Sequence, residues 1–218
     1  MRGVWFEPTE AALFLTFGVV MITTAPRCIN RIRLRFVRAH KNRRAYWESS
    51  MIKIRKAMLE DLEGITDIYN HAILKTTTTF DTEPKTIDEQ KRWFREHGLK
   101  YPLLVAENER LVIGWSSLSP WSDRCAYSDT AEISVYVKRE YRGKGIGKRL
   151  IKAVLREGRD AGLHTVIARV SEGNDASIHM FEAFGFSHIG IMKEVGRKFG
   201  KLRDVSLMQK IFENSSSR

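Results

Sequence analysis

Hydrophobic and polar residues alternate between helical and strand periodicity along most of the chain. Apolar residues recur at helical spacing over about residues 59–74, and Thr86 with Glu89 forms a capping box that opens a second helix. Two β-rich runs at 103–106 and 111–118 flank a polar turn. Together with a short β run at 53–56, this part of the chain predicts a strand, two helices and an antiparallel hairpin.

The second half of the chain continues the same alternation. A strand over 130–137 leads through a glycine-rich loop to a helix that ends near Ala161, and a strand over 165–170 leads to a helix that begins near Asn174. Two more β runs follow, near 187–192 and 205–211. The alternation predicts an α/β fold of mixed (α+β) type, with a mixed central sheet and helices on both faces.

Length and composition favour one globular domain without a metal. The 218 residues suffice for one well-buried core and are few for two. The two cysteines, Cys28 and Cys125, are far apart, and the six histidines show no metal-ligand spacing. We therefore expect no metal site and a reducing, cytoplasmic location.

The positive charge of the chain is concentrated near its start. Residues 1–50 carry nine Lys or Arg and three Asp or Glu, which gives +6 of the total net charge of +11. Most of this excess lies in a basic run over 27–44, which would suit nucleic acid or anionic lipid and would equally suit a solvated tail. The remaining residues give no comparable reason to expect a nucleic-acid partner for the core domain.

The glycine-rich loop is the clearest candidate for ligand binding. Its residues are Arg142, Gly143, Lys144, Gly145, Ile146 and Gly147, and Lys148 follows. Glycines at alternate positions let backbone N–H groups approach an anion at the positive end of a helix, and the basic side chains add fixed charge. The loop has neither Walker nor dinucleotide spacing, so it predicts a pyrophosphate site of another kind.

This loop, of the form R-x-x-G-x-G, resembles the acetyl-CoA loop of the GNAT N-acetyltransferases. Residues 174–186 resemble the GNAT segment N-x-x-S-x-x-x-(Y/H)-E-x-x-G-F. Further segments are similar to the phosphinothricin and methionine sulfoximine acetyltransferase branch, at 68–72, 79–84, 124–127, 131–137 and 195–200. The resemblance runs from about Met51 to about Ile211, with its motifs in the same order.

The resemblance implies a GNAT acyl-CoA N-acyltransferase fold and a reaction. The acetyl group of acetyl-CoA would move to the free amine of a small amino-acid-like substrate, with Glu132 as general base. The implied cofactor-binding residues are the seven loop positions above together with Val135, Tyr136, Val137, Asn174 and Ser177. The implied substrate-binding residues are Phe80, Arg124 and Tyr127. A homodimer is also implied.

One position departs from the family pattern. Phe181 stands where the superfamily has a tyrosine or a histidine, and a phenyl ring cannot donate a proton to the departing thiolate. His179 is two residues away, about 200° around a helix, so we expect it to lie on the surface. We expect the thiolate to leave with the help of solvent or of the product ammonium.

Three other functions remain open at this point. One is an acetyltransferase that acts on a protein N-terminus or a lysine. Another is an acetyl-CoA-binding protein without turnover, which the phenylalanine at position 181 permits. The third is a basic nucleic-acid or membrane-binding protein that depends on residues 27–44.

Residues 1–50 are expected to be an extension outside the fold core, followed by an acetyltransferase domain over 51–213. The apolar run at 11–25 is shorter than the about 20 residues of a membrane span, and Glu7 and Glu10 argue against a signal peptide. A membrane association is therefore not expected. The family-like sequence starts directly after Met51.

A chain that begins at Met51 is expected to keep the activity and the melting temperature of the full-length protein, because residues 1–50 contribute nothing to the predicted core. Thermal denaturation and acetyl-CoA turnover of the two chains check this. A clear loss in either measurement would place residues 1–50 inside the working domain.

Overall fold

The computed structural model describes residues 52–213. The predicted extension over 1–50, with its apolar and basic runs, lies outside the described residues. Among the described residues, no helix is both long and apolar enough to cross a membrane.

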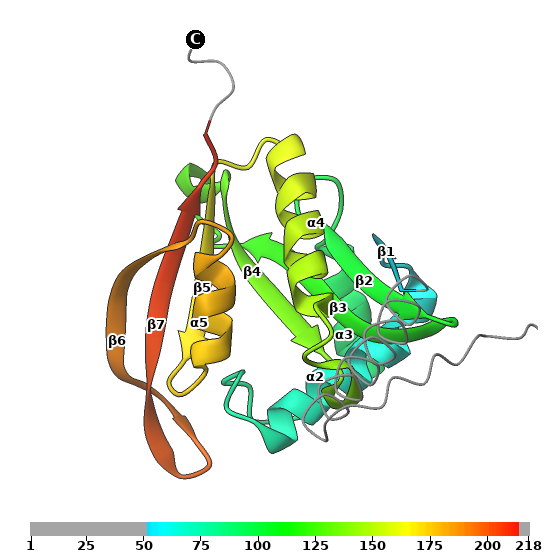
Figure 1. The fold of residues 1–218 in the computed structure, drawn as a ribbon, viewed down its shortest axis with the longest axis horizontal. Coiled ribbons are helices and arrows are strands. Elements are labelled where there is room, and N and C mark those ends of the chain that lie inside the picture. The colour runs from blue at the N-terminus through cyan, green and yellow to red at the C-terminus, as the bar shows by residue number, and fades with distance from the viewer. Residues whose placement is uncertain (1–51, 214–218) are drawn as a thin grey trace, which may run out of the picture. The chain divides into compact units, whose positions relative to one another are not determined.

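A seven-stranded mixed sheet organises the chain (Figure 1). Its strands are β1 (Lys53–Lys56), β2 (Leu103–Asn108), β3 (Leu111–Pro120), β4 (Thr130–Val137), β5 (Thr165–Ser171), β6 (Ser187–Lys198) and β7 (Lys201–Ile211). The spatial order is β1-β2-β3-β4-β5-β7-β6. Neighbours are antiparallel except for β4 and β5, which run parallel.

Helices cover both faces of the sheet, as predicted. They are α2 (Leu62–Lys75), α3 (Ile87–Arg95), α4 (Ile146–Asp160) and α5 (Asp175–Glu182), with short 3-10 turns at η1 (Leu59–Asp61), η2 (Cys125–Tyr127) and η3 (Arg139–Tyr141). Leu150 and Val154 of α4 and Phe181 of α5 are buried in one apolar cluster against the sheet. Ile65 of α2 and Trp115 of β3 belong to a second cluster. Each helix pair therefore buries its apolar stripe against its own side of the sheet.

Local sequence signals account for several element boundaries. Thr86 caps α3 by accepting the N–H of Glu89 at 3.2 Å, while the Glu89 carboxylate accepts the N–H of Thr86 at 2.7 Å. The predicted capping box is thus confirmed. The β2–β3 hairpin turns at Glu109 and Arg110, whose φ angles of 50° and 67° suit a tight two-residue turn.

The last two strands are longer than the predicted runs at 187–192 and 205–211. They continue to a turn at Phe199 and Gly200, whose φ angles are 49° and 76°. The ladder between β6 and β7 carries irregularities near Gly190 and between Met192 and Gly196. These bulges interrupt the strict alternation of side chains, so the sequence pattern alone hides the continuity of the strands.

Candidate functional site

Strands β4 and β5 pair for three residues and then separate. The parallel ladder joins residues 130–132 of β4 to residues 165–167 of β5. Beyond this point β4 continues along β3 and β5 continues along β7, and Figure 1 shows the two strands diverging. The facing edges of β4 and β5 therefore carry backbone groups that no longer bond across to each other.

The register of β4 decides which backbone groups face this separation. Lys138, just after β4, donates its N–H to Ile113 at 2.9 Å, and Thr130 accepts the N–H of Trp121 at 3.2 Å. Alternate residues of an antiparallel strand bond to the same neighbour, so the even-numbered residues of β4 bond toward β3. The N–H groups of Val135 and Val137 consequently point toward β5, whereas that of Tyr136 does not.

The glycine loop follows the free end of β4. Gly143 and Gly145 have φ angles of 74° and 78°, a left-handed conformation that costs a residue with a Cβ about 1–2 kcal/mol. Gly145 is the N-cap of α4, so the N–H groups of Ile146 and Gly147 belong to the first, unpaired turn of that helix. The loop therefore directs backbone donors and the positive end of a helix dipole outward.

Basic side chains surround the loop. The Arg142 Nε donates to the carbonyl of Val137 at 3.0 Å, which ties the loop to the end of β4. The Lys144 ammonium lies 5.1 Å from the ring centroid of Tyr141, and Lys148 is exposed. The loop thus combines outward-facing backbone donors with positive charge, and its role as an anion site stays a prediction.

Helix α5 lies beside the start of α4. A Cβ added at Gly147 would lie 3.2 Å from the sulfur of Met180, so the glycine lets the two helices approach. Asn174 is the N-cap of α5, but its side chain makes no capping hydrogen bond; its carbonyl accepts the N–H of Ser177 at 2.9 Å. The helix thus begins directly after Asn174, close to its predicted start. Gly185, with φ of 80°, follows the helix end.

Glu132 lies where β4 and β5 part, and it is held by an arginine that the sequence analysis did not select. Arg169 of β5 donates from Nε to Oε1 at 2.6 Å and from Nη2 to Oε2 at 2.5 Å. The Arg169 guanidinium also lies 5.8 Å from the ring centroid of Trp121. The hydrogen bond to Glu132 raises the pKa of Arg169 above its already high ordinary value.

An aromatic cluster lies next to this ion pair. Tyr136 packs against Trp115 and Tyr69, with ring centroids 4.8 Å and 5.2 Å away. Burial raises the pKa of both tyrosines. Their hydroxyls are therefore neutral donors at physiological pH rather than bases.

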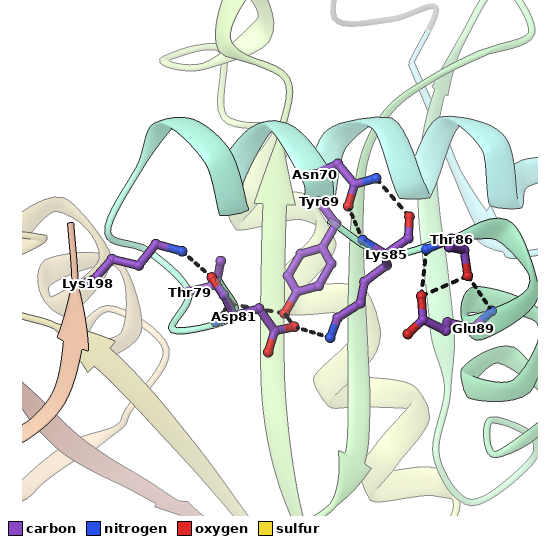
Figure 2. A network of polar contacts seen from close by, with 8 residues as sticks. All are labelled: Tyr69, Asn70, Thr79, Asp81, Lys85, Thr86, Glu89 and Lys198. Carbon is purple, nitrogen blue, oxygen red and sulfur yellow. Dashed lines mark hydrogen bonds and ion pairs between the residues drawn. The ribbon is translucent and has the colours of Figure 1, made fainter. Parts of the chain in front are cut away.

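The loop between α2 and α3 is fastened to α2 by side chains (Figure 2). Tyr69 donates to Asp81 at 2.8 Å and its hydroxyl lies 3.0 Å from that of Thr79. Asn70 donates to the Lys85 carbonyl at 2.9 Å and accepts the Lys85 N–H at 2.7 Å. This loop carries Phe80, so the contacts fix the position of a predicted substrate-binding residue.

The same loop is joined to the β6–β7 hairpin. A Cβ added at Gly196 would lie 2.5 Å from Cδ2 of Phe80, so the ring of Phe80 rests directly on the glycine. Lys198, 2% exposed, donates from its ammonium to the carbonyl of Asp81, as Figure 2 shows. Burial lowers the pKa of Lys198. The hairpin and the loop thus form one wall beside the aromatic cluster.

Arg124 and Tyr127 lie in the connection between β3 and β4. Both are exposed, and Tyr127 donates its N–H to the Arg124 carbonyl at 2.9 Å. Within the described residues, neither side chain makes a hydrogen bond or an ion pair. The structure therefore places them on the loop that leads to Glu132 without bringing them into contact with it.

Phe181 is 4% exposed and packs on Phe186, with ring centroids 5.0 Å apart. It is a core residue. His179 is exposed and lies 3.1 Å from the Glu182 carboxylate. The predicted surface position of His179 is confirmed.

Two hollows mark the described surface. One of about 200 Å³ lies beside the glycine loop and α2, and residues that line it include Asp67, His71, Tyr136, Val137 and Arg142. The other, of about 420 Å³, lies near the first residue of β5, and none of its lining residues is a predicted site residue. We therefore assign the site to the region where β4 and β5 diverge. Among residues 52–213, no cluster of three or more His, Cys, Asp or Glu could hold a metal ion.

Three residues of this region, Arg169, Tyr69 and Asp81, were not among the predicted site residues. One available signal was that Arg169, like Glu132, is a charged residue inside an otherwise β-patterned strand. Tyr69 and Asp81 lie in the segments that resemble the phosphinothricin branch, but neither position shows by itself that a helix and a loop meet there.

Comparison with known proteins points to one family. The model of the Acetyltransferase (GNAT) family matches residues 65–186. An L-methionine sulfoximine/L-methionine sulfone acetyltransferase of Pseudomonas aeruginosa is 38% identical over 158 residues, covering 72% of this chain and 92% of the relative.

Solved structures agree with this result. A GNAT superfamily phosphinothricin acetyltransferase from Sinorhizobium meliloti in complex with acetyl-CoA matches with a TM-score of 0.72 and 33% identity, covering 77% of this chain and 92% of that one. A ribosomal-protein-alanine N-acetyltransferase from Brucella melitensis matches with a TM-score of 0.71 and 35% identity, covering 73% of this chain and 99% of that one. The chain belongs to the GNAT acetyltransferase family.

Proposed function

We propose that this protein transfers the acetyl group of acetyl-CoA to the free amine of a small amino-acid-like substrate of the phosphinothricin or methionine sulfoximine type. The observation that carries the proposal is the parting of β4 and β5 at Glu132, with the glycine loop at the end of β4. The methionine sulfoximine and phosphinothricin acetyltransferases to which the chain is similar support this substrate class.

The residues at the separation of β4 and β5 suit acetyl-CoA, which supplies the acetyl group as a thioester. The unpaired first turn of α4, with Arg142, Lys144 and Lys148, would hold the pyrophosphate. The N–H of Val135 or Val137 would donate to the thioester oxygen as negative charge develops there. Asn174 and Ser177 on α5 would border the same ligand.

Replacing Gly145 with alanine is expected to weaken acetyl-CoA binding. The φ angle of 78° is strained for alanine by about 1–2 kcal/mol, so the loop would relax and misdirect the N–H groups of the first turn of α4. Titration with acetyl-CoA and the KM for acetyl-CoA measure the effect. Gly190→Ala is the matched control, because its added Cβ meets no atom within 4 Å and its φ is not positive. Equal affinities in all three proteins would remove the loop from the cofactor site.

Glu132 is the proposed general base, acting directly or through a water molecule on the substrate ammonium. It is partly buried where the two strands part, and its carboxylate is fixed by Arg169. The attacking amine must lose a proton, and a fixed carboxylate at this place can accept it. Because Phe181 offers no proton, the thiolate would be protonated by solvent or by the product ammonium.

Glu132→Gln is expected to lower kcat by about 100- to 10,000-fold, because it removes the proton acceptor, while the affinity for acetyl-CoA stays the same, because the glycine loop is unchanged. Thiol release from acetyl-CoA is followed with methionine sulfoximine, phosphinothricin and a panel of free amino acids. Glu157→Gln on α4 is the control and should keep wild-type activity. A fully active Glu132→Gln variant would contradict the assignment.

The same assay tests the proposed function itself. The alternative with structural support is acetylation of a protein N-terminus, since the Brucella melitensis neighbour is named for such a reaction. Release of thiol with an alanine-starting peptide and with no free amino acid would favour that alternative. Binding of acetyl-CoA without turnover on any amine would favour a non-catalytic protein.

We also propose that two copies of the chain associate. β6 is an outer strand of the sheet, and apolar side chains that are about half exposed cluster on β6, on β7 and at their turn. They are Ile189, Ile191, Val195, Phe199 and Leu202. Exposed apolar side chains on an outer hairpin could be buried against a second copy of the chain. Three other expectations stay predictions. They are the division at residue 50, the lack of a nucleic-acid partner for the core domain, and the cytoplasmic location. The free thiol of Cys125 is compatible with that location.

Light scattering is expected to give about twice the chain mass of 25.2 kDa for the wild type. Ile191→Glu should shift the protein toward the monomer because it places a charge in the apolar patch. Leu111→Glu, at a similarly exposed position at the start of β3, should leave the mass unchanged. A monomeric wild type would exclude the association.

A further inference from the structure

The ion pair between Glu132 and Arg169 uses only one edge of the guanidinium. Glu132 accepts from Nε and Nη2, which is the side-on edge. An arginine has five N–H donors, so three remain, and two of them lie on the end-on edge between Nη1 and Nη2. The Arg169 side chain is 51% exposed, so part of the guanidinium is accessible.

The pair lies at the point where the strands part. Ile167 is the register partner of Glu132, and Arg169 follows two residues later on the same face of β5. Its guanidinium reaches back to the carboxylate across the first unpaired positions of the two strands. A carboxylate and a guanidinium are thus presented side by side next to Val135 and Tyr136.

We propose that Arg169 binds the carboxylate of the amino-acid substrate through its remaining donors, so that Glu132 and Arg169 together recognise the zwitterion. This inference rests on the proposed function. In a free amino acid the ammonium and the carboxylate share one carbon atom, and the ion pair presents the opposite charges at neighbouring positions. The ammonium meets Glu132 while the carboxylate meets Arg169, and the original ion pair stays intact.

The charge balance favours this arrangement over a substrate held by Glu132 alone. An incoming carboxylate would be repelled by Glu132, and Arg169 is the cation bonded directly to Glu132, whereas the nearby Asp81 is already paired with Lys85 at 3.1 Å. A planar guanidinium fork matches a carboxylate with two parallel hydrogen bonds. The ring of Trp121 lies beside the guanidinium, with its centroid 5.8 Å from the guanidinium carbon. Arg124, in contrast, is exposed, and its side chain makes no hydrogen bond or ion pair with the described residues.

The test compares methionine sulfoximine with its primary carboxamide, which keeps the amine and lacks the negative charge. Equilibrium binding to the CoA-saturated protein and the kinetic constants are measured for the wild type, Arg169→Gln and Arg169→Lys. Arg169→Gln is expected to weaken binding of the acid and to raise its KM by about 10- to 100-fold, and to leave the carboxamide nearly unchanged. The KM of Arg169→Lys for the acid should lie between those of the wild type and Arg169→Gln, since lysine keeps the positive charge but lacks the two parallel donors of the guanidinium.

Arg159→Gln on α4 is the matched control and should change the binding of neither the acid nor the carboxamide. If Arg169→Gln weakens acid and carboxamide equally, Arg169 only positions Glu132 and the proposal is wrong. If the discrimination disappears in Arg124→Gln and persists in Arg169→Gln, the carboxylate contact belongs to Arg124 and the proposal is also wrong. A wild type that releases no thiol with any free amino acid would refute the proposed function, and the binding comparison would still decide the role of Arg169.

Discussion

The parting of β4 and β5 is the constraint on which the rest of the site depends. In a sheet, the backbone donors and acceptors of an inner strand normally bond to both neighbouring strands. β4 and β5 pair with each other over only three residues and then lose these mutual hydrogen bonds. The separation directs the N–H groups of Val135 and Val137 away from β3. It also places Glu132 at the last paired position and lets an arginine from the opposite strand reach it. The helices α4 and α5 cover the same opening from one face of the sheet.

Much of this arrangement follows from the sequence, because local signals set it. The capping box at Thr86, the positive φ angles of Gly143 and Gly145 and the strand at β4 follow from residue types at fixed spacings. The glycine loop is of this kind, since one contiguous segment supplies its backbone shape and its basic side chains.

The features that could not be predicted from the sequence are contacts between segments that are distant along the chain. The partner of Glu132 is 37 residues away on another strand, and the partner of Lys198 is 117 residues away. No periodicity encodes such pairs. The irregularities in the β6–β7 ladder likewise hide long strands behind a broken alternation. Arg124 shows the opposite case: a motif points to it, and its side chain makes no hydrogen bond or ion pair with the described residues.

The wall formed by Phe80 on Gly196 and by Lys198 on Asp81 has a consequence for how the enzyme is made. Its two halves come from the second connection of the domain and from the final hairpin, so they emerge from the ribosome far apart in time. The glycine loop, α4 and the paired part of β4 and β5 can form before that hairpin is synthesised. The proposed cofactor side of the site can therefore form first, and the proposed acceptor side is incomplete until the β6–β7 hairpin has been added.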